Sequence, residues 1–209
     1  MTMILLTGFG PFPGAPFNPT EALVMRLARE RRPAHADVTI VPHIFRTSYA
    51  AVDSDLPALI RKNKPDAILM FGLAARTPHL RIETLARNAV ARSADAERSA
   101  PKSRLIGKGA RGRALATPAR ALLAAAREAR VPAALSRDAG RYLCNYLCWR
   151  AAEAAGSKNG PRLAVFIHVP LVRRGASPLG ASKHHRLGQA DLARAGRGFL
   201  RAVAAAVRR

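Results

Sequence analysis

This 209-residue chain contains only two cysteines, Cys144 and Cys148, so no disulfide framework supports its fold. Its apolar runs are short, and none approaches the roughly 18 apolar residues of a membrane-spanning helix. The first residues lack both the basic start and the long apolar run of a signal peptide. Together these shortages predict a soluble, cytoplasmic protein in a reducing compartment.

Acidic residues are also scarce: 13 Asp and Glu stand against 35 Lys and Arg, which leaves a formal net charge of +22. Such an excess suits a nucleic-acid partner, because cationic side chains neutralise phosphates. However, the arginines are scattered, and aromatic residues, which would stack on bases, make up only 5% of the chain. This pattern argues against a nucleic-acid partner. A basic binding protein without catalytic activity stays open as an alternative.

Short apolar runs alternate with longer helical stretches along the whole chain. Residues 91–116 are polar and glycine-containing and are expected to form a long loop, and Pro57 is expected to interrupt a helix. We predict an α/β fold with a largely parallel sheet in a single domain over residues 1–209. The expected strands are 3–7, 37–45, 66–72, 79–86, 133–136 and 162–169; the expected helices are 19–32, 48–63, 117–130, one from about 144 and one from about 189.

Three residues could together perform acyl transfer. Cys144 stands at the start of an apolar helical run, where the positive end of the helix dipole stabilises a thiolate. His168 lies at the carboxyl end of the buried strand FIHV, and Glu83 lies in an alternating extended segment. Nucleophile, base and orienting carboxylate are the components of a cysteine hydrolase. Each residue also has a structural interpretation: a buried thiol, a hydrogen-bonded core histidine and a surface ion-pair partner.

Other motifs do not support cofactor or metal binding. Gly8, Gly10 and Gly14 have the wrong spacing for a dinucleotide fingerprint, and the intervening prolines lack the N–H groups that a pyrophosphate needs. The adjacent His184 and His185 point in different directions and have no carboxylate nearby in sequence, so no metal site is predicted.

The turn after the first strand carries Phe9 and Phe12. Because ligands of open α/β sheets bind at the carboxyl ends of strands, these rings could form an apolar binding loop. They could equally be buried in the core. Asn18, which precedes Pro19, is placed to cap the following helix.

Four blocks of sequence carry a resemblance to a known family. The chain resembles the pyrrolidone-carboxylate peptidases (pyroglutamyl peptidase I), cysteine peptidases that remove an N-terminal pyroglutamate. The resemblance covers roughly residues 3–205, and the last two blocks are specific only in combination. The blocks are LLTGFGPFPG with Phe17-Asn18-Pro19, ETLARN at 83–88, SRDAGRYLCN at 136–145 and FIHVP at 166–170.

The resemblance implies a three-layer α/β/α sandwich around a largely parallel, mixed sheet. It also implies a cofactor-free cytoplasmic enzyme, commonly a homo-oligomer and often a tetramer, that acts on small peptides with a blocked N-terminus. Cys144 would be the nucleophile, His168 the general base and Glu83 the residue that orients the histidine.

The same resemblance implies a pocket for the flat pyrrolidone ring, formed by Phe9, Phe12, Asn18 and Tyr142. One departure concerns Leu73, which replaces a family glutamine whose amide can recognise the lactam. Losing a polar partner is expected to weaken the preference for pyroglutamate. A related cysteine amidase with different acyl specificity is therefore a second alternative.

Overall fold

The computed structural model describes residues 1–12, 15–30, 37–173 and 187–209. Gly14, His184 and His185 lie outside these ranges. A six-stranded sheet has the order β2-β1-β3-β8-β4-β7, in which only the β4–β8 pairing is antiparallel. Its strands are β1 (Thr2–Phe9), β2 (Val38–Phe45), β3 (Ala67–Leu73), β4 (Leu80–Glu83), β7 (Ala133–Ser136) and β8 (Leu163–Val169). This mixed sheet confirms the predicted α/β class.

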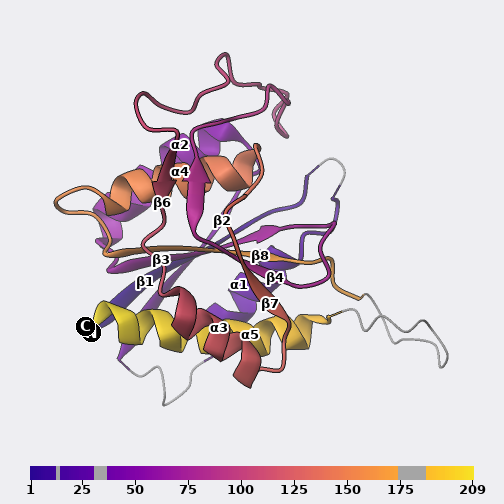
Figure 1. Cartoon of the computed structure of the whole chain (residues 1–209), viewed down its shortest axis with the longest axis vertical. Coiled ribbons are helices and arrows are strands. Elements are labelled where there is room, and N and C mark those ends of the chain that lie inside the picture. The colour runs from indigo at the N-terminus through magenta and orange to yellow at the C-terminus, as the bar shows by residue number, and fades with distance from the viewer. Residues whose placement is uncertain (13–14, 31–36, 174–186) are drawn as a thin grey trace.

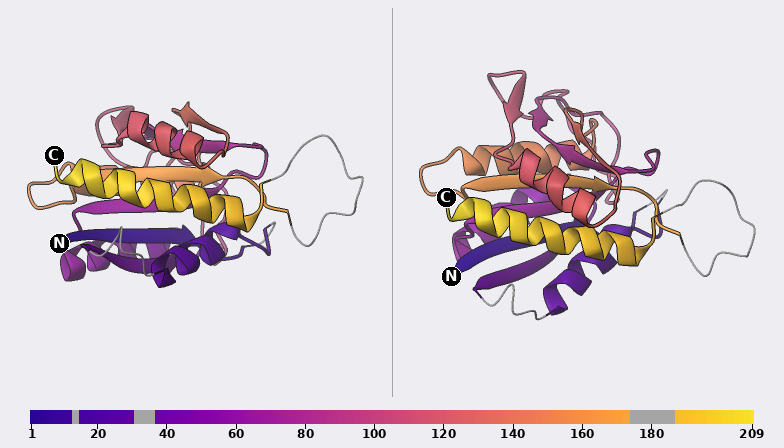
Figure 2. Two further views of the ribbon diagram at one scale, coloured as in Figure 1. Left: turned by 90° about the horizontal axis from the view of Figure 1, so that it is seen from below. Right: turned by 60° about the horizontal axis from the view of Figure 1, so that its bottom comes forward.

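Helices cover both faces of the sheet and complete the expected three layers (Figure 1). Side chains alternate along β1, so that Ile4 and Leu6 pack on one face and Leu5 packs on the other. The first face is covered by α1 (Pro19–Arg29), α3 (Ala119–Glu128) and α5 (Gln189–Val207), and the second by α2 (Tyr49–Asn63) and α4 (Leu143–Ala155). Figure 2 shows α5 lying along its face beside α3. No helix among the described ranges is long and apolar enough to cross a membrane.

Helix α1 begins where the sequence predicts it. Asn18 Oδ1 accepts a hydrogen bond from the Thr20 backbone N–H at 3.1 Å, and Pro19 takes the first helical position. The helix ends at Arg29, three residues before the expected end.

Helix α2 is continuous from Tyr49 to Asn63, so the expected break at Pro57 is wrong. Pro57 and Asp53, the residue one turn before it, are both exposed, so water can satisfy the carbonyl that loses its N–H partner. Val52 and Leu56 meanwhile pack into the core and hold both halves of the helix on the sheet. Tertiary packing therefore outweighs the cost of the proline.

Residues 91–116 contain a short strand that the sequence analysis missed. β6 (Gly112–Ala114) pairs antiparallel with β5 (Leu85–Arg87) to form a separate two-stranded sheet. The buried Asn88 side chain accepts hydrogen bonds from the Ile106 and Gly107 N–H groups at 2.9 and 3.0 Å. The loop is thus tied to the strand that follows Glu83.

We expect Pro57→Ala to raise the free energy of unfolding by about 1–2 kcal/mol, because alanine restores the helical N–H and removes the ring clash. The greater freedom of the unfolded alanine chain offsets part of this gain. Urea unfolding followed by circular dichroism measures the change. Lys62→Ala, an exposed change on the same helix, is the control and is expected to stay within about 0.5 kcal/mol. A less stable Pro57→Ala protein would contradict this interpretation.

Candidate active site

A pocket of about 580 Å³ opens at the carboxyl ends of β1, β3 and β8. Seven of the eight residues predicted for the site line it: Phe9, Phe12, Asn18, Leu73, Tyr142, Cys144 and His168. The eighth, Glu83, is completely buried and contacts His168. The fold therefore brings together residues that are up to 159 positions apart, as Phe9 and His168 are.

The sheet register aligns Glu83 with His168. In the antiparallel β4–β8 pair, Glu83 lies opposite Phe166, and His168 is two residues further along β8. Residues two apart on a strand share a face, so the two side chains are diagonal neighbours. Glu83 Oε1 lies 2.8 Å from His168 Nδ1, and His168 is only 4% exposed. This contact fixes the imidazole and leaves its other nitrogen for a second partner.

Two further groups compensate the buried Glu83 carboxylate. The Arg81 guanidinium lies 3.2 Å from Oε1, and the Asp138 backbone N–H donates to Oε2 at 3.2 Å. The sequence analysis missed Arg81, although strand alternation places residues 81 and 83 on the same face. A buried carboxylate without such partners would be strongly destabilising.

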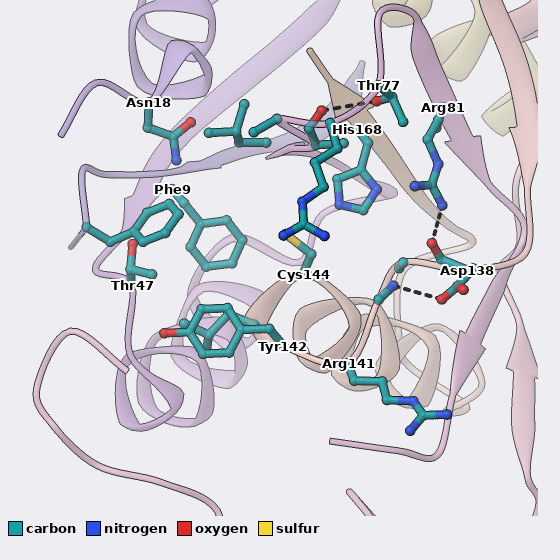
Figure 3. Close-up of a pocket in the computed structure, with 18 residues that line it drawn as sticks. Phe9, Asn18, Thr47, Thr77, Arg81, Asp138, Arg141, Tyr142, Cys144 and His168 are labelled. Atoms are coloured by element: carbon teal, nitrogen blue, oxygen red, sulfur yellow. Dashed lines mark hydrogen bonds between the residues drawn. The ribbon is translucent and has the colours of Figure 1, made fainter. Parts of the chain in front are cut away.

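Cys144 completes a chain of contacts with His168 and Glu83. The Cys144 side chain hydrogen-bonds to His168, and the two lie next to each other in the pocket (Figure 3). Burial by itself lowers the pKa of His168. The charge and hydrogen bond of Cys144 and those of Glu83 oppose burial and raise this pKa to about 9. The site therefore favours an imidazolium at neutral pH.

The Cys144 thiol has space because β3 carries a glycine opposite His168. Gly72 pairs with His168 in the β3–β8 register, and a Cβ at position 72 would lie 2.9 Å from Cys144 Sγ and 2.5 Å from Phe166 Cζ. Both distances are shorter than real Cβ contacts allow. Glycine in a strand interior commonly marks such a close approach.

Cys144 is the second residue of α4, as its sequence context predicts. Its neighbour Asn145 is fully buried, and the Asn145 amide donates to the Arg87 and Ala89 carbonyls at 2.8 Å while its oxygen accepts from the Arg87 N–H at 2.9 Å. These bonds fasten the start of α4 to β5. The backbone N–H groups in the first turn of α4 point toward the N-terminal end of the helix, where Cys144 lies.

One end of the pocket is aromatic. Phe9 and Tyr142 lie on the same side of Cys144 in Figure 3, and Phe12 also lines the cavity. Phe9 is 3% exposed, and the centroid of its ring lies 5.9 Å from that of Phe45. Phe9 therefore belongs both to the core and to the wall of the pocket. Half-buried Leu73 adds an apolar wall at the end of β3.

Asn18 lines the pocket, but its polar atoms already have partners. Its Nδ2 donates to the Gly10 carbonyl at 3.2 Å, and its Oδ1 accepts from both the N–H and the hydroxyl of Thr20. Asn18 thus holds the turn after β1 in place, and its contact with substrate stays a prediction. Thr47, which the sequence analysis missed, donates to the same Gly10 carbonyl at 3.2 Å.

The other end of the pocket is polar. Thr77, Arg81 and Asp138 lie there, on the far side of Cys144 and His168 from Phe9 (Figure 3). Arg76 and Arg141 also line the cavity. Except for Arg81 on β4, these residues lie on loops that have no regular pattern, so the sequence analysis missed them. Within the described ranges, no group of three or more His, Cys, Asp and Glu side chains could hold a metal ion.

Comparison with known proteins identifies the family of this chain. The sequence profile of the pyroglutamyl peptidase family matches residues 2–184. The chain belongs to the pyroglutamyl peptidase family. It is 35% identical to a pyrrolidone-carboxylate peptidase of Thermococcus onnurineus over 175 residues, covering 83% of this chain and 86% of that protein. It is 30% identical to the pyrrolidone-carboxylate peptidase of Cupriavidus pinatubonensis over 207 residues, which cover 98% of this chain and 92% of that protein.

Solved structures share the fold of this pyroglutamyl peptidase family member. A mutant pyrrolidone carboxyl peptidase of Pyrococcus furiosus superimposes with a TM-score of 0.86 at 24% identity, covering 99% of this chain and all of the other. The pyrrolidone carboxyl peptidase of Thermococcus litoralis gives a TM-score of 0.82 at 24% identity, and the match covers 99% of this chain and 96% of the other. The resemblance read from the sequence is confirmed, as is the α/β/α architecture.

The two cysteines of this family member differ in their surroundings. Cys148 is completely buried, and burial raises its pKa well above the usual range, whereas Cys144 is partly exposed and contacts His168. We expect brief treatment with iodoacetamide at pH 7 to alkylate Cys144 alone, because the thiolate is the reactive form. Peptide mass spectrometry locates the label. Native Cys144→Ala protein should remain unlabelled, and alkylation of Cys148 in the folded wild type would contradict the assignment.

Proposed function

We propose that this chain is a cysteine peptidase that hydrolyses the amide bond after an N-terminal pyroglutamate through a thioester intermediate. The observation that carries the proposal is the chain of contacts from Cys144 through His168 to the buried Glu83, beside an aromatic pocket. In this role Cys144 is the nucleophile, His168 the acid and base, and Glu83 the orienting carboxylate.

In the first step, the Cys144 thiolate attacks the pyroglutamyl carbonyl carbon and forms the carbon–sulfur bond. The carbonyl electron pair moves onto oxygen, and N–H groups at the start of α4 are placed to stabilise that oxyanion. When the tetrahedral intermediate collapses, the carbon–nitrogen bond breaks and His168 gives its proton to the departing amine. A pKa of about 9 keeps that proton available at neutral pH.

In the second step, neutral His168 accepts a proton from water, and the resulting hydroxide attacks the thioester carbonyl. Collapse releases pyroglutamic acid and returns the thiolate beside the imidazolium. Glu83 stabilises this imidazolium and holds the ring in one orientation throughout, because its carboxylate is 2.8 Å from Nδ1.

The aromatic end of the pocket suits a flat lactam ring. Phe9, Phe12 and Tyr142 supply apolar faces, while the Tyr142 hydroxyl is occupied as a donor to the Ala94 carbonyl at 3.1 Å. Leu73 supplies packing where the family has an amide. The preference for pyroglutamate in this chain is therefore weaker than an amide at this position would provide.

The proposal extends to the assembly and its compartment. Residues 1–209 form one functional domain, since both core clusters pack on the same sheet. The protein acts in the cytoplasm as a homo-oligomer, a tetramer by resemblance. The edge strand β7 supports association, because an edge offers unpaired backbone groups and Leu135 on it is 51% exposed.

The test is release of aminomethylcoumarin from its pyroglutamyl amide under reducing conditions. We expect turnover by the wild type and a loss of at least about 10³-fold in kcat for Cys144→Ser, because a serine hydroxyl is a far weaker nucleophile beside an imidazolium. Glu83→Gln should lower kcat with little change in KM, since Glu83 lies outside the pocket and acts through His168.

Two results would redirect the proposal. No turnover with Cys144 still readily alkylated favours a cysteine amidase of different acyl specificity. No turnover with an unreactive Cys144 favours a basic binding protein, whose binding to nucleic acid would weaken steeply with salt.

A further inference from the structure

We propose that this enzyme prefers pyroglutamyl peptides that carry a carboxylate close after the scissile bond, and that Arg76 and Arg141 recognise it. This inference rests on the proposed function and concerns the leaving peptide, which that function leaves open. It follows from the two ends of the pocket and from the charges that line one of them.

The position of Cys144 divides the pocket into an acyl side and a leaving side. Phe9 and Tyr142 lie on one side of Cys144, and Thr77, Arg81 and Asp138 lie on the other (Figure 3). A lactam ring held at the aromatic end places its carbonyl at Cys144 and directs the amine toward the polar end. A cavity of 580 Å³ has room for more than the ring alone.

Most charged groups at the polar end already neutralise one another. Arg81 contacts Glu83 at 3.2 Å and donates to Ser136 Oγ at 2.6 Å. The Asp138 carboxylate pairs with Arg87 at 3.2 Å and accepts from the Gly140 N–H at 3.0 Å. These groups are therefore not free to bind a charged substrate.

Arg76 and Arg141 remain without a carboxylate partner among the residues that the structure describes. Both are exposed and line the cavity, and Arg141 lies at the edge of its polar end, near Asp138 (Figure 3). A guanidinium presents a planar fork of donors that matches a carboxylate. Two guanidiniums that line the cavity without a carboxylate partner, with Arg141 on the leaving side, thus favour an anionic peptide.

The charge of the whole chain acts in the same direction. A net charge of +22 attracts anionic peptides and repels basic ones over long range. The net charge of the chain acts on any anionic peptide, wherever its carboxylate lies. Recognition by Arg76 and Arg141 instead depends on these two residues. Removing them therefore has a larger effect than removing two arginines elsewhere on the surface.

The experiment compares two matched pairs of substrates by kcat/KM, with the released amine measured. Pyroglutamyl-aspartyl amide against pyroglutamyl-asparaginyl amide tests a side-chain carboxylate. Pyroglutamyl-alanine against its amide tests a C-terminal carboxylate. We expect the charged member of at least one pair to be preferred about fivefold at low salt, and the preference to shrink toward one at about 1 M salt.

The variant Arg76→Gln/Arg141→Gln should remove most of that preference and leave only the part that the net charge of the chain supplies. The variant Arg120→Gln/Arg127→Gln removes the same charge from exposed positions on α3, outside the pocket, and should retain the ratio. A preference for the charged member of either pair supports the inference. The pair that shows it tells whether the recognised carboxylate is a side chain or the C-terminus of the peptide.

Equal kcat/KM within both pairs in the wild type overturns the inference and leaves the proposed function intact, because the neutral substrates are still cleaved. A ratio that survives Arg76→Gln/Arg141→Gln, or falls equally in the α3 variant, overturns the assignment to these two residues. Absence of turnover on every pyroglutamyl substrate overturns the proposed function, and this inference with it.

Discussion

The hydrogen bond between Glu83 and His168 is the interaction on which the site depends. It joins two buried polar groups in the middle of a sheet, where an unpaired charge would be costly. The antiparallel register of β4 against β8 is what makes the pair neighbours. Arg81 and the Asp138 N–H occupy the remaining positions around the carboxylate, so its charge is balanced before a substrate arrives. The one antiparallel pairing of the large sheet therefore has a chemical consequence.

Around this pair, small backbone features decide where the nucleophile sits. Gly72 leaves the space that Cys144 Sγ occupies, and Asn145 fastens the start of α4 to the strand after Glu83. The thiol is thereby held against His168, between the aromatic end and the polar end of the pocket. A ring and a charged leaving peptide would then fit opposite sides of the same sulfur.

The sequence is sufficient to predict features that depend on neighbouring residues. The Asn18-Pro19 cap, the strand before His168 and the helix at Cys144 all follow from local patterns. The prediction of a helix break at Pro57 is wrong because the sequence shows only the local cost of a proline inside a helix. The packing of α2 on the sheet, which offsets that cost, comes from the rest of the fold. Strand β6 is missed because three residues are too few to show the alternation of apolar and polar side chains that indicates a strand. Its stability comes from pairing with β5, which the local sequence does not reveal. Arg76 and Arg141 reach the pocket on irregular loops, and their positions require the three-dimensional arrangement.

The most direct test of this account is the protonation state of His168 in the folded protein. Histidine labelled with ¹⁵N allows each imidazole to be titrated by NMR, with the His168 signals assigned from a His168→Gln sample. The account predicts that His168 keeps its second proton until about pH 9, above the ordinary value of 6.5, and that Cys144→Ala lowers this pKa by removing a raising charge and hydrogen bond. A His168 that titrates near 6.5 in the wild type and does not respond to Cys144→Ala would contradict the coupled arrangement.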